Sequence, residues 1–93
     1  MEGKKLGLEE VEWLVNRLFE SLEKVVKPQK LSWVLTELTN IITDYDDYVV
    51  FGGVLNALIS RTDYCEEKGN LELRDIYLTA WRKANAIYKE LFY

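Results

Sequence analysis

Histidine is absent from this 93-residue chain, and cysteine, methionine and proline each occur only once. Without histidine there is no imidazole for a catalytic triad, a cysteine–histidine pair or a typical zinc site. Cys65 has no second cysteine to bond with, so an intrachain disulfide is excluded and a reducing compartment is expected. One proline together with 30% charged residues argues against extended disorder.

Long apolar runs are also missing. The most apolar window, residues 48–59, is interrupted by Asn56 and is too short to cross a bilayer. Residues 1–13 lack the apolar core of a secretory signal. The net charge of −4 argues against a general duplex-binding protein, because such proteins neutralise phosphates with an excess of Lys and Arg. We therefore expect a soluble, cytoplasmic protein with no membrane association.

Apolar residues recur at spacings of three and four along the whole chain, which is the pattern of amphipathic helices. Pro28 separates the first two stripes, Asn70 is a suitable N-cap for the last, and Gly69 is a suitable end for the third. The pattern predicts an all-α fold, a compact up-down four-helix bundle in one domain over residues 1–93, with 1–7 as a flexible tail. The stripes are Leu8, Val11, Val15, Leu18, Leu22 and Val25; Leu31, Leu35, Leu38, Ile42 and Tyr45; Phe51, Leu55, Leu58, Thr62 and Cys65; and Leu73, Tyr77, Ala80, Ala84, Ile87 and Leu91.

Residues 48–55 can be interpreted either as a helix or as a β-hairpin. Gly52-Gly53 fits the turn of a β-hairpin, but an isolated hairpin is marginal in water and the sequence shows no third strand. A helix is favoured, and the two glycines are where it would kink. In that helix Gly53, Ala57 and Ser60 form a stripe of small residues that allows a neighbouring backbone to approach closely. The first and last stripes keep a heptad spacing, so a coiled coil with another copy is the alternative to packing within one chain.

Catalytic and metal-binding patterns are weak. The chain has no Gly-rich phosphate loop and no nucleophile elbow. A cluster of three acids, Asp44, Asp46 and Asp47, could hold a divalent cation through its oxygen ligands. A simpler interpretation is that these acids lie in a turn, where their negative charge stabilises the start of the next helix. Cys65 falls on an apolar stripe, as expected of a small buried hydrophobe. We expect no enzyme activity, no cofactor and no metal.

Two of the three tryptophans lie opposite the apolar stripe of their own helix. Trp13 shares its polar face with Arg17, and Trp33 shares its polar face with Glu37. Either a loop or a terminus covers these indoles, or they contact a partner; tryptophan is enriched at interface hot spots, and we favour contact with a partner. The sequence thus predicts a small accessory or adaptor module that docks on a larger protein in preference to self-associating, with Trp13, Arg17, Trp33 and Glu37 in the interface.

The last helix offers an alternative surface along one flank. Aromatic rings bordered by cations can stack the bases of a single strand or meet an acidic protein patch. A solvated helix face is the commoner reason for such a pattern, and the acidic total charge weakens the nucleic-acid interpretation further. The alternative function is a nucleic-acid-binding protein, or a subunit of a nucleic-acid-processing assembly. Its surface would consist of Arg74, Trp81, Arg82, Tyr88 and Lys89.

Overall fold

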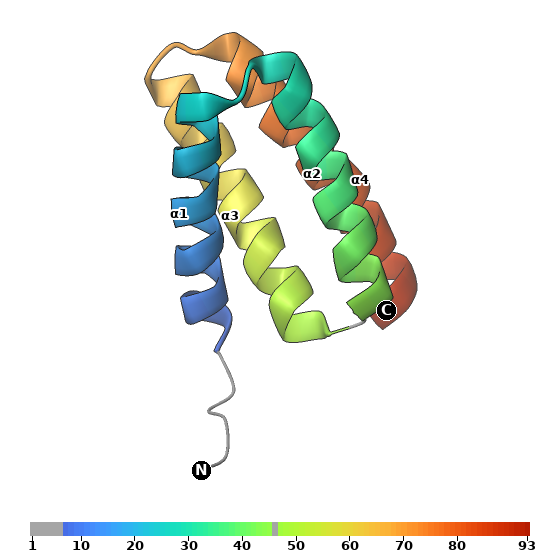
Figure 1. Cartoon of the computed structure of the whole chain (residues 1–93). Helices are drawn as coiled ribbons and strands as arrows, with labels where there is room; N and C mark the ends of the chain where they lie inside the picture. The colour runs from blue at the N-terminus through green and yellow to red at the C-terminus, as the bar shows by residue number, and fades with distance from the viewer. Residues whose placement is uncertain (1–6, 46) are drawn as a thin grey trace.

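The computed structural model describes residues 7–45 and 47–93. They form four helices: α1 (Leu8–Val25), α2 (Pro28–Tyr45), α3 (Tyr48–Glu67) and α4 (Leu71–Phe92). Successive helices run up and down through the molecule (Figure 1). The predicted all-α four-helix bundle is confirmed, and the alternative hairpin at 48–55 is wrong because α3 covers this segment. Residues 1–6 of the expected tail lie outside the described residues.

The ends of the helices follow the local sequence. Pro28 is the first residue of α2, where its missing N–H is not needed for an intrahelical bond. Asp47 caps α3, and its carboxylate accepts hydrogen bonds from two amides of the first turn at 2.9 and 3.3 Å. Asn70 caps α4 in the same way, at 3.3 Å. Gly69 has a φ of 77°, the left-handed conformation that commonly follows a helix and that glycine adopts without strain.

The helices do not pack in chain order. α1 packs mainly on α3, α3 on α4, and α4 on α2, whereas α2 touches α1 and α3 only slightly. The two helices that rise in Figure 1, α1 and α3, are therefore neighbours, and so are the two that descend, α2 and α4. Short connections led us to expect antiparallel neighbours, but only the α3–α4 pair follows this rule closely. As a result, α1 and α2 stand at the front of the view in Figure 1 without packing closely on each other.

The contact between α1 and α3 depends on a glycine. A Cβ atom built on Gly53 would lie 2.4 Å from Cγ1 of Val11 and 3.2 Å from the backbone N of Glu12. Any side chain at this position would therefore push the two helices apart. Gly53 and Ala57 are both buried, and α3 runs without a break through Gly52 and Gly53. The predicted close approach is confirmed at Gly53, whereas Ser60 of the predicted stripe is exposed.

The core differs from the predicted stripes mainly in α1. Its buried or half-buried face comprises Val11, Val15, Phe19, Leu22 and Val26. Leu8, Leu18 and Val25 were expected inside but are exposed, whereas Phe19 was left out of the stripe and is fully buried. Apolar residues occupy two adjacent strips along α1, and the strip that contains Phe19 is the one that packs against α3. In α4, Leu91 is exposed as well; the side chain of Tyr45 lies outside the described residues.

Candidate functional site

Both outward tryptophans project into solvent. Trp13 is 59% exposed and Trp33 is 64% exposed, so the sequence correctly predicted their orientation. The guanidinium of Arg17 lies over the Trp13 ring, 5.2 Å from its centroid. Such a cation–π contact at an exposed site contributes only about 0.5–1 kcal/mol and leaves most of the indole accessible. Glu37 follows Trp33 by one helical turn and is also exposed.

A second apolar strip on α1 is uncovered. Leu14, Leu18 and Val25 are 47%, 46% and 81% exposed, respectively. Their spacing places them on one side of the helix, about 80° round the axis from the face that contacts α3. They are therefore neither part of the α1–α3 contact nor shielded by it.

The second helix has a matching strip. Leu31, Leu35 and Ile42 are buried and belong to the hydrophobic core. Val34, Leu38 and Ile41 lie on an adjacent side of α2, about 90° round the axis. Val34 and Leu38 are half-buried, and Ile41 is 61% exposed.

These two strips face each other, because both helices are right-handed and they run in opposite directions. Seen from the α1–α2 connection, α1 runs toward the viewer and α2 runs away (Figure 1). Successive residues of a right-handed helix then advance anticlockwise on α1 and clockwise on α2. Consequently the α1 strip is rotated from its α3 contact toward α2, and the α2 strip is rotated from its α4 contact toward α1. We call the surface formed by Leu14, Leu18, Val25, Val34, Leu38 and Ile41 the α1–α2 face.

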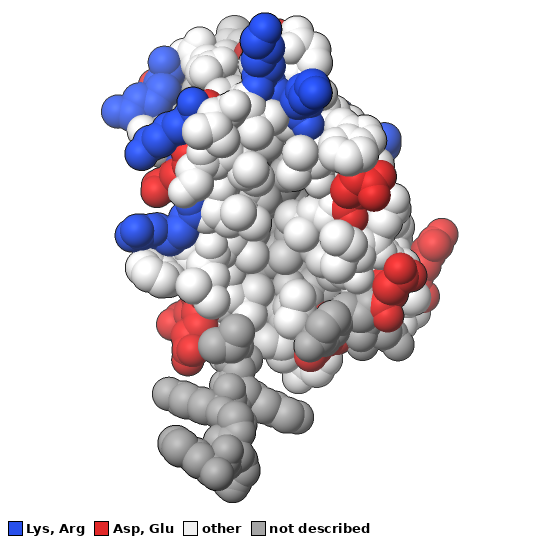
Figure 2. All heavy atoms as spheres, in the orientation of Figure 1, with Lys and Arg blue, Asp and Glu red and all other residues white. Residues whose placement is uncertain are grey.

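Figure 2 shows this region as a largely uncharged furrow between α1 and α2, with charged side chains along its flanks. Trp13 lies about 120° and Trp33 about 105° beyond the strip on its own helix, so each indole stands on the outer side of its helix. The two tryptophans that the sequence singled out therefore lie on the outer sides of the two helices that carry the apolar strips. The sequence did not reveal this surface, because its residues were assigned to the core or to no stripe.

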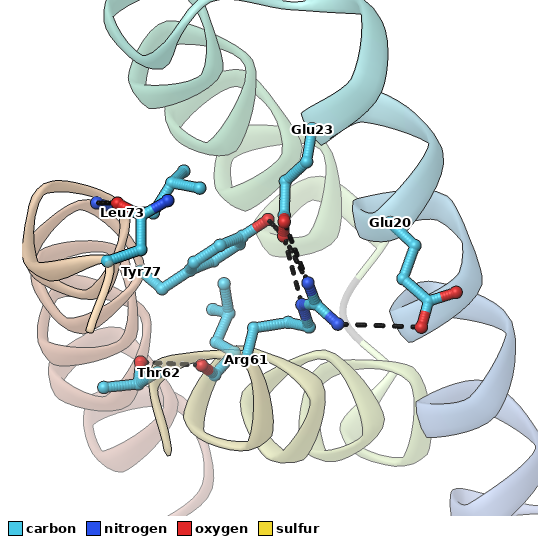
Figure 3. Close-up of polar contacts among 8 residues, drawn as sticks. Glu20, Glu23, Arg61, Thr62, Leu73 and Tyr77 are labelled. Atoms are coloured by element: carbon cyan, nitrogen blue, oxygen red, sulfur yellow. Dashed lines mark hydrogen bonds and ion pairs between the residues drawn. The ribbon is translucent and has the colours of Figure 1, made fainter. Parts of the chain in front are cut away.

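Sequence reasoning also missed a buried polar cluster that joins three helices (Figure 3). Glu23 of α1 accepts two hydrogen bonds from Nη2 of Arg61 in α3, at 2.8 and 2.9 Å, and one from its Nε at 3.1 Å. The hydroxyl of Tyr77 in α4 donates to the same carboxylate at 2.5 Å. Glu20 lies 3.6 Å from Nη1 of Arg61 and is more exposed. The ring of Tyr64 lies beneath the guanidinium, whose carbon is 4.5 Å from the ring centroid.

Burial and ion pairing both shift the pKa values of groups in this cluster. Desolvation and the hydrogen bond to Glu23 raise the pKa of Tyr77 far above its ordinary value. Burial lowers the pKa of Arg61, but the hydrogen bond and the charge of Glu23 outweigh it and leave the pKa raised. Burial, followed by the charge of Glu23, raises the pKa of the Cys65 thiol. Within the described residues no buried side-chain nitrogen or oxygen lacks a partner. The cluster is a fully paired clamp between α1, α3 and α4.

One signal for this clamp was visible in the sequence. Arg61 sits between Leu58 and Cys65 on the inward side of α3, and Glu23 sits between Leu22 and Val26 on the inward side of α1. Each of two predicted helices thus has a charged residue at an inward position, and the two charges are opposite. This indicates a buried ion pair, since charges are rarely buried unless they are paired.

The residues of the flank predicted on α4 differ in exposure and in pairing. Arg74 forms ion pairs with Glu66 at 3.0 Å and Asp75 at 2.9 Å. Trp81 and Tyr88 are half-buried and pack against the hydrophobic core. The remaining two cations of this flank, Arg82 and Lys89, are exposed. The rings thus face the core while one of the cations already has acidic partners.

The acidic turn between α2 and α3 serves a structural purpose. Asp47 is the cap of α3 described above, which fits the simpler of its two interpretations. Asp44 is exposed, and Asp46 lies outside the described residues. In the part of the chain that the structure describes, no three His, Cys, Asp or Glu side chains are grouped to hold a metal ion. Cys65 is buried, as predicted.

No protein-family model matches this chain, and neither the curated proteins nor the solved structures contain a significant match. None of the four described helices combines the length and the hydropathy that crossing a lipid bilayer requires.

Proposed function

We propose that this protein is a small, non-enzymatic interaction module of the cytoplasm, an accessory or adaptor subunit that docks on another protein through the α1–α2 face. The observation that carries the proposal is the largely uncharged furrow in Figure 2, together with the exposure of Leu14, Leu18, Val25 and Ile41 on the two helices beside it. Contiguous exposed apolar surface of this kind is uncommon on monomeric proteins and marks interaction sites.

The flanking tryptophans strengthen this proposal. An indole at an interface adds apolar area and one N–H donor, and truncating such a residue commonly costs about 2 kcal/mol or more of binding free energy. Trp13 and Trp33 lie on opposite flanks of one face, so a single partner can contact both. Arg17 beside Trp13 and Glu37 beside Trp33 supply one charge of each sign on these flanks.

Affinity purification of the tagged protein from its native host, followed by quantitative mass spectrometry, tests the proposal. The wild type is compared with a Trp13→Ala/Trp33→Ala variant and with a Leu71→Ala control. Leu71 is 52% exposed at the start of α4 and lies outside the α1–α2 face. We expect the tryptophan variant to lose proteins that the wild type and the control both retain. Retention of the same proteins by all three would contradict the proposal.

A further inference from the structure

We infer that the partner protein presents an acidic segment to the end of the bundle where α1 joins α2. Lys24, Lys27, Lys30 and Trp33 bind this segment, and we call these four residues the lysine end. The inference rests on the proposed function, since it gives the chemistry of the partner at one end of the molecule. Two features carry it: the lysines lack acidic partners among the described residues, and Trp33 shares a hollow with one of them.

The fold takes away the acidic partners that the sequence offers to these lysines. Glu20 lies four residues before Lys24, a spacing at which opposite charges pair in an isolated helix. Glu23 stands in the same relation to Lys27. In the structure, however, Arg61 of α3 pairs with both glutamates, at 3.6 and 2.8 Å. Among the described residues no ion pair involves a lysine of this end, so three ammonium groups are available to an external anion.

The three lysines extend from the last turn of α1 through the connection to the first turn of α2, and all are exposed. Figure 2 shows Lys and Arg gathered mainly in this half of the visible face. The first turn of α2 contains no acidic residue. Glu72 and Asp75 of α4 line a hollow with Ser32, but Ser32 lies about 160° round α2 from Lys30. The lysine end is therefore locally positive on a chain whose net charge is −4.

The two exposed tryptophans differ in their electrostatic surroundings. Trp33 and Lys30 line one shallow hollow. Trp13 lines another with two glutamates of the first turn of α1, and Arg17, which lies over its ring, offsets one of these charges. A carboxylate of a partner is therefore favoured beside Trp33 and not beside Trp13.

An acidic protein segment suits the lysine end better than a nucleic acid does. Phosphates would also attract the lysines, but binding a strand depends on neutralising many phosphates, and the chain as a whole is negative. The lysines are also interleaved with exposed apolar surface, since Val25 is 81% exposed and Trp33 is 64% exposed. A segment that combines carboxylates with apolar side chains can contact both kinds of surface.

The first experiment measures the binding of two labelled probes to the full chain by fluorescence anisotropy at low salt. The probes are a polyglutamate peptide and a polythymidine strand of equal length. The matched variants are Lys24→Glu/Lys27→Glu/Lys30→Glu at the lysine end and Arg82→Glu/Lys83→Glu/Lys89→Glu, which changes three exposed cations of α4.

We expect the peptide to bind the wild type, with a dissociation constant that rises about tenfold or more in the lysine-end variant. The α4 variant changes the net charge equally and should weaken binding much less. Circular dichroism shows whether both variants keep their helices. No binding of the peptide, or equal weakening by the two variants, would overturn the inference. Binding of the strand alone would overturn it in favour of a nucleic acid.

A second measurement locates the bound peptide. In ¹⁵N spectra the indole N–H resonance of Trp33, identified with Trp33→Phe, should shift as polyglutamate is added. The resonance of Trp13 should shift less, because two glutamates line its hollow. Equal shifts of the two resonances, or a larger shift of Trp13, would contradict binding at the lysine end.

Capture of host proteins separates the inference from the function on which it rests. If Trp13→Ala/Trp33→Ala loses host proteins that the lysine-end variant keeps, docking is supported and the acidic partner segment is overturned. If neither variant loses any protein, both are overturned. Both are supported if the two variants lose the same proteins, the α4 variant keeps them, and polyglutamate shifts Trp33.

Discussion

Replacing Gly53 with alanine tests how closely α1 approaches α3. Alanine at a helix-interior position is favoured over glycine by about 0.8–1.0 kcal/mol, so propensity alone predicts stabilisation. The added methyl group, however, would lie 2.4 Å from Cγ1 and 2.6 Å from Cβ of Val11, and 3.2 Å from the backbone N of Glu12. None of these atoms belongs to the end of a flexible side chain, so the helices must separate. The clash should therefore exceed the gain in propensity.

The expected size follows from these two opposing effects. Overpacking a well-packed contact costs about 1–3 kcal/mol, and the 2.4 Å contact places Gly53→Ala near the upper end. After subtraction of the propensity gain, the free energy of unfolding should fall by about 2 kcal/mol. A chain of this length is stable by about 5–14 kcal/mol, so the loss is readily measured. Urea denaturation followed by circular dichroism gives the difference, and the midpoint temperature should fall by about 8–16 °C.

The neighbouring glycine provides the matched control. A Cβ on Gly52 would meet only Cδ1 of Leu8, at 2.9 Å, and that atom is the end of an exposed side chain that can rotate away. Gly52→Ala should therefore stabilise the protein by up to about 1 kcal/mol. Combining Gly53→Ala with Val11→Ala should recover only part of the loss, because Cβ of Val11 remains. If Gly53→Ala stabilises the chain as Gly52→Ala does, the close approach of α1 to α3 is refuted.

Three further predictions concern the clamp and the caps. Glu23→Ala should lower the free energy of unfolding by about 3–5 kcal/mol in urea denaturation, because it leaves the buried guanidinium of Arg61 without its main partner. The folded state raises the pKa of Tyr77, so the unfolded chain releases this proton first as the pH rises. The contribution of Tyr77 to the free energy of unfolding, measured by denaturation at several pH values, should therefore be fully present below about pH 10. Above that pH it should fall by about 1.4 kcal/mol per pH unit for one proton. Tyr77→Phe should reduce this slope. Asp47→Ala should cost about 0.5–2 kcal/mol in thermal unfolding, because α3 loses its cap.

Each of these predictions has a matched control. Glu20→Ala removes a more exposed acid near the same arginine and should cost about 1 kcal/mol or less; an equal loss from both changes would contradict the buried pair. Tyr64→Phe removes an exposed phenol, and a slope that Tyr64→Phe and Tyr77→Phe change alike would count against the clamp. Asp44→Ala should change stability by less than about 0.5 kcal/mol, so an effect as large as that of Asp47→Ala would argue against capping.

The candidate surface could be predicted from the sequence only in part. The orientation of Trp13 and Trp33 follows from the period of an α-helix, and both indoles are exposed. The strip formed by Leu14, Leu18 and Val25 could not be predicted as exposed. Apolar residues cover a wide arc of α1, and periodicity does not indicate which part of that arc meets a neighbour. The inward position of Glu23 was visible in the sequence, but its pairing with Tyr77, 54 positions away, was beyond the reach of local patterns.

Local rules were sufficient for the number and ends of the helices. Apolar spacing, the proline at 28, the cap at 70 and the glycine at 69 act within a turn or two of the chain, and the structure agrees with all of them. Which helices pack against each other is decided by the tertiary structure. Gly53 lets α1 approach α3, the Glu23–Arg61–Tyr77 clamp joins α1, α3 and α4, and α2 is held mainly by α4. Side-chain shape and charge act there across large separations in sequence, and this arrangement leaves the α1–α2 face uncovered.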